Sequence, residues 1–157
     1  MQKITRDQLL NKALSLLQDG TVNAVLGWKK GELSYDITPA LFKSEEDLKE
    51  NFVWNDLCGA NFAKYLVKHT DRYEGKILVF LKPCDTYSFN QLLTEHRFDR
   101  EKVYALGVPC DGMVSVNSLK KLVGEGIVNI EENNDELLVT SLYADQPISV
   151  KKNDVLL

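Results

Sequence analysis

In the first half of the chain, segments with the hydrophobic spacing of a helix alternate with short apolar segments typical of strands. Leucines and an alanine from Thr5 to Leu17 recur at helical spacing, which predicts an amphipathic helix with Thr5 as its N-cap. Ser44 followed by Asp47 resembles a capping box and predicts a helix that ends near Asn51. The same pattern predicts three further elements, namely a strand at residues 22–28, a return strand at 33–37 and a helix at 55–66.

The second half contains two near-continuous apolar runs, at residues 76–81 and 103–108, separated by a helical segment at 86–96. Such runs are typical of strands buried on both faces of a parallel sheet, so the order predicts a βαβ unit. Later segments predict a helix at 118–123, a hairpin of strands 127–130 and 137–140, and a strand at 147–150. We therefore expect an α/β fold: a small, mostly parallel sheet flanked by helices, with a C-terminal β-hairpin.

Length and charge narrow the class of protein. The 157 residues, 44% of them hydrophobic, suffice for one domain over residues 1–157. Acidic residues outnumber basic ones, 23 to 19, and no basic face is evident, so a nucleic-acid partner is not expected. The sequence has neither a secretory signal nor an apolar run long enough to cross a membrane, so we expect a cytoplasmic protein without a membrane partner.

The strongest chemical signal is a repeated tripeptide, Pro-Cys-Asp, with its cysteines at Cys84 and Cys110. Each copy directly follows an apolar run, and the carboxyl ends of neighbouring parallel strands are where open α/β sheets bind ligands. Both sulfurs are therefore expected near one ligand. We expect Asp85 and Asp111 to cap the helices that follow, where a helix dipole favours the thiolate form.

Each of the other residues near these cysteines has both a functional and a purely structural interpretation. Lys82 would support a thiolate or an anionic cofactor, or it would simply lie at an exposed strand end. Thr86, with Tyr87 and Ser88, could donate hydrogen bonds to flavin phosphates or only cap a helix. Free cysteines are often buried as small apolar side chains, and this alternative is as strong as a chemical role for Cys58.

Several familiar sites find no support. Neither Gly-x-Gly-x-x-Gly nor a Walker A loop occurs, so the sequence gives no direct indication of a Rossmann or P-loop nucleotide site. There is no Cys-x-x-Cys and no cysteine–histidine pair at zinc spacing, which disfavours a complete structural zinc site. His69 and His96 fall near predicted helix ends, where a partly positive imidazole is favourable, so an acid–base role is disfavoured.

Three blocks of the sequence together resemble a known family. They are LCGANFAKYL at residues 57–66, KPCD at 82–85 and GVPCDG at 107–112. Over about residues 20–130 the chain is similar to the N-terminal part of the beta subunits of coenzyme F420-reducing hydrogenases and F420-dependent formate dehydrogenases.

The resemblance implies an iron–sulfur flavoprotein that passes electrons between a 4Fe-4S cluster and FAD, and in some members on to a deazaflavin. It implies redox subunits of the hydrogenase or dehydrogenase type as partners. It also implies that Cys84, Cys110, Cys58 and Asn61 line the redox site, with the three cysteines as metal ligands. Cysteine-rich cluster segments usually adjoin this region, and the sequence contains none.

Three functional hypotheses follow. The first is part of an electron-transfer flavoprotein subunit, and the second is a non-enzymatic module that docks a partner redox subunit. The third, a thiol enzyme using Cys84 or Cys110, ranks last because no base lies at motif spacing. The apolar residues at the C-terminus suggest the N-terminal fragment of a longer redox subunit.

Overall fold

A computed structural model describes residues 3–157, and its largest element is a mixed sheet, called here the larger sheet. Three strands are parallel and adjacent: β1 (Ala24–Lys30), β4 (Ile77–Leu81) and β5 (Val103–Gly107). β2 (Ile37–Phe42) and the short β3 (Phe52–Val53) both pair antiparallel with β1. The predicted mostly parallel sheet is confirmed, and β4 is buried at all five positions, as its apolar run indicated.

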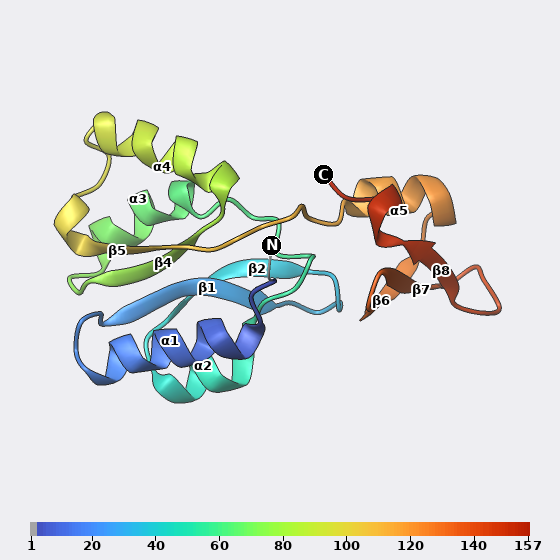
Figure 1. The fold of residues 1–157 in the computed structure, drawn as a ribbon, viewed down its shortest axis with the longest axis horizontal. Coiled ribbons are helices and arrows are strands. Elements are labelled where there is room, and N and C mark those ends of the chain that lie inside the picture. The colour runs from blue at the N-terminus through green and yellow to red at the C-terminus, as the bar shows by residue number, and fades with distance from the viewer. Residues whose placement is uncertain (1–2) are drawn as a thin grey trace.

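Helices cover both faces of the larger sheet. α1 (Arg6–Gln18) and α2 (Glu45–Asn51) lie on one face, and α3 (Ala63–Arg72) and α4 (Pro83–Thr94) lie on the other (Figure 1). Thr5 caps α1 in a capping box with Gln8, and Ser44 caps α2. Both predicted N-caps are confirmed. Among residues 3–157, no helix is long and apolar enough to cross a membrane.

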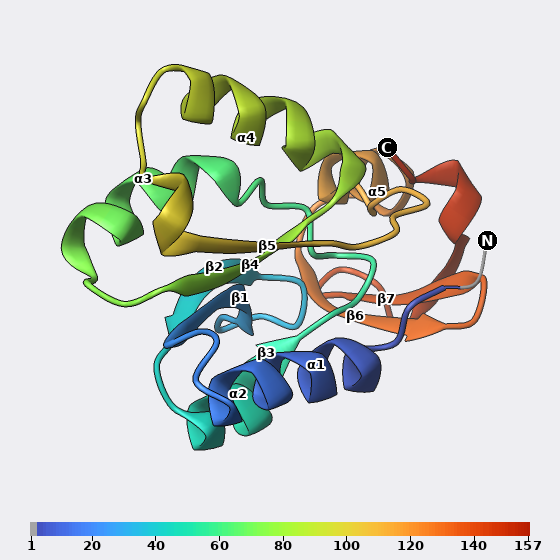
Figure 2. The same cartoon turned by 60° about the vertical axis from the view of Figure 1, so that its left-hand side comes forward.

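The C-terminal third forms a second, smaller region, which Figure 1 shows beside the larger sheet. Its helix α5 (Val116–Val123) packs with the antiparallel strands β6 (Ile127–Asn133), β7 (Glu136–Ser141) and β8 (Ile148–Lys151). A short 3₁₀ helix, η2 (Lys152–Asp154), follows, and another, η1 (Arg100–Lys102), precedes β5. The predicted hairpin is β6–β7, and the predicted strand at 147–150 is β8. The three strands form the smaller sheet (Figure 2).

The predicted helix at residues 55–66 is wrong in its position. Residues 55–62 form a loop, and α3 begins at Ala63. The Asn55 side chain accepts a hydrogen bond from the N–H of Leu57 at 3.0 Å, which turns the chain before a helix can form. Asn61 does the same for the N–H of Ala63, also at 3.0 Å, at the start of α3.

The predicted return strand at residues 33–37 is also displaced. The turn after β1 is longer than expected because Gly31 donates to the carbonyl of Asp36 at 2.6 Å, and Asp36 donates to the carbonyl of Leu33 at 3.1 Å. The strand therefore runs over residues 37–42. Pro39 is tolerated there because β2 lies at the edge of the larger sheet, where a missing N–H donor costs little.

Candidate functional site

The two Pro-Cys-Asp tripeptides start at the same edge of the larger sheet. β4 and β5 are parallel neighbours with Leu81 opposite Gly107, and the N–H of Val108 donates to the carbonyl of Leu81 at 2.9 Å. Both strands end at this pair, and the segments that follow leave the sheet within two residues of it. The structure therefore confirms the expected juxtaposition of the two strand ends.

Cys84 lies on the first turn of α4 and is exposed. Pro83 occupies the first helical position, where its missing N–H costs nothing. Beside this turn, α4 and β5 enclose an open and mostly apolar groove of about 390 Å³, bordered by Pro83, Thr86, Phe89 and Pro109 among others. Cys84 is not one of the residues that line this groove.

Cys110 is half-buried and lines a different space. Its cavity, of about 250 Å³, lies where the larger sheet meets the smaller region. The residues that line this cavity include Lys3, Trp54, Asp56, Cys110, Asp111 and Lys152. The two cysteines thus start from one edge, but Cys110 lines this cavity and Cys84 does not.

Lys82 and Asp85 form a buried ion pair behind the Cys84 turn. Their side chains are 1% and 0% exposed, and Lys82 Nζ lies 3.3 Å from Asp85 Oδ2. The same carboxylate oxygen accepts the backbone N–H of Lys82 at 3.0 Å, which fixes the start of α4. Lys82 Nζ also donates to the carbonyl of Ala60 at 2.9 Å and lies 5.0 Å from the centre of the Trp28 ring.

This geometry corrects two expectations about charges. Lys82 is not an exposed strand-end lysine, because its ammonium extends into the core toward the loop that precedes α3. Asp85 does cap α4, from its third position, as predicted. Asp111 caps no helix: α5 begins at Val116, and Ser115 is its N-cap.

Asn61 and Thr86 make local structural bonds. Asn61 Nδ2 donates to Ser88 Oγ at 3.1 Å and so joins the start of α3 to α4. The Thr86 hydroxyl donates to the carbonyl of Pro83 within the first turn of α4. Asn61 therefore ties α4 to the start of α3, and Thr86 stabilises the first turn of α4.

Cys58 is buried in the core of the larger sheet. Its Sγ accepts the N–H of Asn55 at 3.3 Å. Burial raises the pKa of its thiol to about 12, even though the Asn55 hydrogen bond and the Lys82 charge act in the opposite direction. Since the thiolate is the form that ligates iron, this environment favours a packing role for Cys58.

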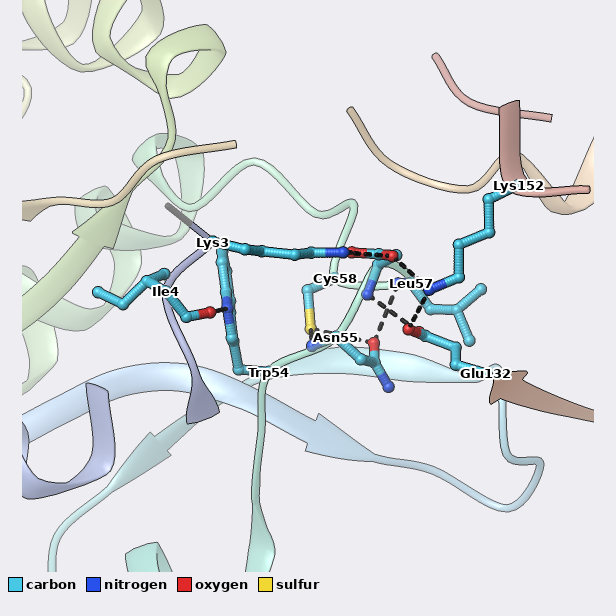
Figure 3. A network of polar contacts seen from close by, with 9 residues as sticks. Lys3, Ile4, Trp54, Asn55, Leu57, Cys58, Glu132 and Lys152 are labelled. Atoms are coloured by element: carbon cyan, nitrogen blue, oxygen red, sulfur yellow. Dashed lines mark hydrogen bonds and ion pairs between the residues drawn. The ribbon is translucent and has the colours of Figure 1, made fainter. Parts of the chain in front are cut away.

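A network of charges beside Cys110 was not anticipated from the sequence (Figure 3). Asp56 accepts hydrogen bonds from Lys3 Nζ at 2.8 Å and from Lys152 Nζ at 2.9 Å, and Lys152 Nζ also donates to Glu132 Oε2 at 3.1 Å. Burial raises the pKa of Asp56, but the two lysine hydrogen bonds outweigh burial and hold that pKa below its usual value. No local motif links residues 3, 56, 132 and 152, so only the fold reveals the network.

The donor set does not fit a 4Fe-4S cluster held by this chain alone. Such a cluster takes four thiolates, whereas the chain has three cysteines, one exposed, one half-buried and one in the core. Within residues 3–157, no three His, Cys, Asp or Glu side chains are grouped as metal ligands would be. The groove between α4 and β5, in contrast, has the apolar walls and the size of a site for a ring system.

The fold and this edge define an α/β protein with two Pro-Cys-Asp segments at the carboxyl ends of neighbouring parallel strands. No family model matches the chain. Over 108 residues, 69% of this chain, it is 30% identical to the F420-dependent formate dehydrogenase subunit beta of Methanocaldococcus jannaschii. The F420-dependent formate dehydrogenase 1 subunit beta of Methanococcus maripaludis matches equally, at 30% over 108 residues.

Over this matched part the chain is therefore similar to F420-dependent formate dehydrogenase beta subunits, which confirms the resemblance carried by its cysteine motifs. It spans 28% and 27% of the length of these two relatives. A chain of the F420-reducing [NiFe] hydrogenase complex from Methanosarcina barkeri shares the fold. There the TM-score is 0.60 at 15% identity, covering 99% of this chain and 61% of that one.

Proposed function

We propose that this chain is part of an electron-transfer subunit of the iron–sulfur flavoprotein type, with its redox site at the carboxyl edge of β4 and β5. The observation that carries the proposal is the parallel pairing that starts both Pro-Cys-Asp loops at Leu81 and Gly107. The relatives at 30% identity are beta subunits of F420-dependent formate dehydrogenases, which supports a redox role for this edge.

In this proposal the groove between α4 and β5 takes the flavin ring of FAD. Its apolar walls would exclude water from one face of the ring, and α4 begins beside it with Thr86 at its rim. FAD, when bound, supplies the two-electron and one-electron chemistry. The chain's own residues bind and orient: Asp85 fixes the Cys84 turn, and Lys82 ties that turn to the Ala60 loop.

A cluster at this site would require thiolates from outside this sequence, since Cys58 is packed in the core. We assign Cys84 and Cys110 as the two cysteines of this chain that approach the redox centre. Hydrogenase-like or dehydrogenase-like redox subunits are the partners that fit such a role.

The test is anaerobic reconstitution of the chain with iron, sulfide and FAD, followed by a visible spectrum. The Cys84→Ser/Cys110→Ser double variant is treated identically. We expect a bound-flavin spectrum that the double variant alters, because each cysteine directly follows a proline, Pro83 or Pro109, that lines the groove. Thr94→Val, at the far end of α4, is the control and should reproduce the wild-type spectrum.

A spectrum identical in the wild type and the double variant would remove both cysteines from the redox site. Binding of FAD with the same affinity after Phe89→Ala, which removes an apolar wall of the groove, would show that the flavin binds elsewhere.

A second candidate function, a docking module for a redox subunit, is favoured by the surface of the smaller region. Leu122, Leu142 and Tyr143 are all exposed there, at 59%, 71% and 82%. This function predicts a colourless protein after reconstitution. It also predicts that the Cys84→Ser/Cys110→Ser variant binds the partner subunit as well as the wild type does.

A further inference from the structure

The C-terminal residues of the chain cover the loop that carries Cys110. The N–H of Leu157 donates to the carbonyl of Met113 at 2.9 Å, and Val114 and Leu156 form an antiparallel bridge. Gly112 has a φ of +123°, and a Cβ at this position would lie 2.9 Å from the carbonyl oxygen of Leu157. The loop and the C-terminal segment are therefore in direct contact two residues beyond Cys110.

Asp56 connects this C-terminal segment to the larger sheet. Its carboxylate binds Lys152, the first residue of η2, whose side chain is only 11% exposed. Its backbone carbonyl accepts the N–H of Val114 at 2.7 Å, and its N–H donates to Glu132 of β6 at 3.0 Å. One residue thus holds three segments of the smaller region at once.

Lys3 completes the arrangement from the N-terminal side. Its Nζ lies 2.8 Å from the Asp56 carboxylate, and its side chain is 63% exposed, so it forms the outer contact of the network. Two neutral hydrogen bonds also join the regions: the hydroxyl of Tyr35 donates to the carbonyl of Ile127, and the N–H of Ile130 donates to Ser34. These bonds involve the start and middle of β6, whereas Lys3, Asp56 and Lys152 all line the cavity of Cys110.

We propose that Asp56, Lys3, Lys152 and Glu132 form a latch that holds the C-terminal segment over the loop of Cys110 and thereby limits access to that thiol. Asp56 comes from the loop before α3, and Lys152 leads directly into the residues that seat on Gly112 and Met113. Release of Lys152 from Asp56 would let this segment move and open the cavity of about 250 Å³.

The latch acts on Cys110 and leaves Cys84 unaffected. Cys84 is already exposed on α4 and does not line the cavity, so opening of the smaller region does not change its surroundings. That the latch regulates a redox centre rests on the function proposed above. The latch itself is tested without any cofactor, so the two proposals fail separately.

The experiment measures alkylation of the full chain by iodoacetamide at neutral pH, with each cysteine followed by mass spectrometry. The variants are Asp56→Asn, Lys152→Met and Lys3→Met. Asp7→Asn is the matched control, because it also removes the charge of an aspartate paired with a base, here with the neighbouring Arg6 on α1.

We expect Asp56→Asn and Lys152→Met to increase the alkylation rate of Cys110 by about tenfold, with the rate at Cys84 unchanged. Lys3→Met should give a smaller increase, since Lys152 still pairs with Asp56. Asp7→Asn should leave all three rates at their wild-type values.

Cys58 reports on general loosening because it lies in the core of the larger sheet. A parallel rise at Cys58 and Cys110 would mean that the variants loosen the whole protein and do not release the C-terminal segment alone, and it would overturn the latch. An unchanged rate at Cys110 in variants that keep the wild-type circular dichroism would overturn it directly.

Discussion

The larger sheet and the smaller region have hydrophobic cores of different composition. The larger sheet encloses a contiguous core in which aromatic side chains meet: the Trp28 ring lies 4.2 Å from that of Phe62 and 6.1 Å from that of Phe80. The core of the smaller region consists of buried aliphatic side chains, including Leu119, Leu137 and Val139. Because large aromatic groups bury more area per residue, the larger sheet has the greater share of hydrophobic stabilisation.

Charges are placed differently as well. In the larger sheet the Lys82–Asp85 pair is sealed within one core and fixes a single turn. At the junction, by contrast, Asp56 from the loop before α3 meets Lys152 and Glu132 of the smaller region. A buried pair inside a core mainly penalises its own disruption. The charges at the junction act together with apolar contacts there, because Leu57, Tyr35 and Ile37 belong to or pack against the core of the smaller region.

The largest effect is expected from Asp85→Asn. The substitution keeps the side-chain shape but leaves the buried Lys82 ammonium without its counter-charge, which should lower the free energy of unfolding by about 3–5 kcal/mol. Denaturation in urea, followed by circular dichroism, measures this loss.

The double variant Lys82→Met/Asp85→Asn is the control, because it removes both charges from the core. It should recover most of the stability, since apolar replacements of a buried pair are often neutral. A double variant as unstable as Asp85→Asn would show that the backbone bond to Asp85, and not the charge pair, carries the effect.

A second prediction compares the two cores directly with Leu26→Ala and Leu137→Ala. Both leucines are fully buried, so each truncation should cost about 3 kcal/mol. Leu26→Ala should lower the protection of the whole chain against hydrogen exchange. Leu137→Ala should raise exchange mainly in β6, β7 and β8 while β4 stays protected, because the larger core does not depend on the smaller one.

Equal loss of protection in β4 and β7 for Leu137→Ala would contradict this difference. The two regions would then unfold as one cooperative unit, and the ionic junction would be a minor part of their coupling.

The periodicity of the sequence predicted most of the fold because most elements carry a local signal. The apolar run of β4, the Thr5 cap and the β6–β7 hairpin are examples in which pattern and burial agree. The prediction was wrong at residues 55–66, where Asn55 and Asn61 bond to nearby backbone N–H groups and prevent an early helix. Helical spacing alone does not reveal that competition.

The candidate site was only partly predictable for the same reason. Proline and strand-end position placed Cys84 and Cys110 at one edge, which the parallel pairing of β4 and β5 confirms. Their different surroundings depend on the smaller region, which covers Cys110 through contacts far apart in the sequence. The inward course of Lys82 likewise depends on Ala60, 22 positions away.

The smallest predicted effect is a loosening of the junction between the two regions at acidic pH. The pKa of Asp56 in the folded protein lies below its ordinary value of 3.8. A carboxylate with a depressed pKa contributes stability above its unfolded pKa and loses that contribution as the pH falls through the folded pKa. Lys152 behaves oppositely: its pKa is raised above 10.5, because the bonds to Asp56 and Glu132 outweigh burial, so its contribution is lost only at higher pH.

Acidification below about pH 4 should therefore loosen the smaller region before it unfolds the larger sheet. The effect is modest because Lys3 is exposed and solvent screens its charge. Amide resonances of β6–β8, followed by NMR from pH 7 to pH 3, measure this loosening against those of β4. Asp56→Asn should flatten the acid dependence of β6–β8. An unchanged profile in that variant would show that Asp56 does not carry the acid sensitivity of the smaller region.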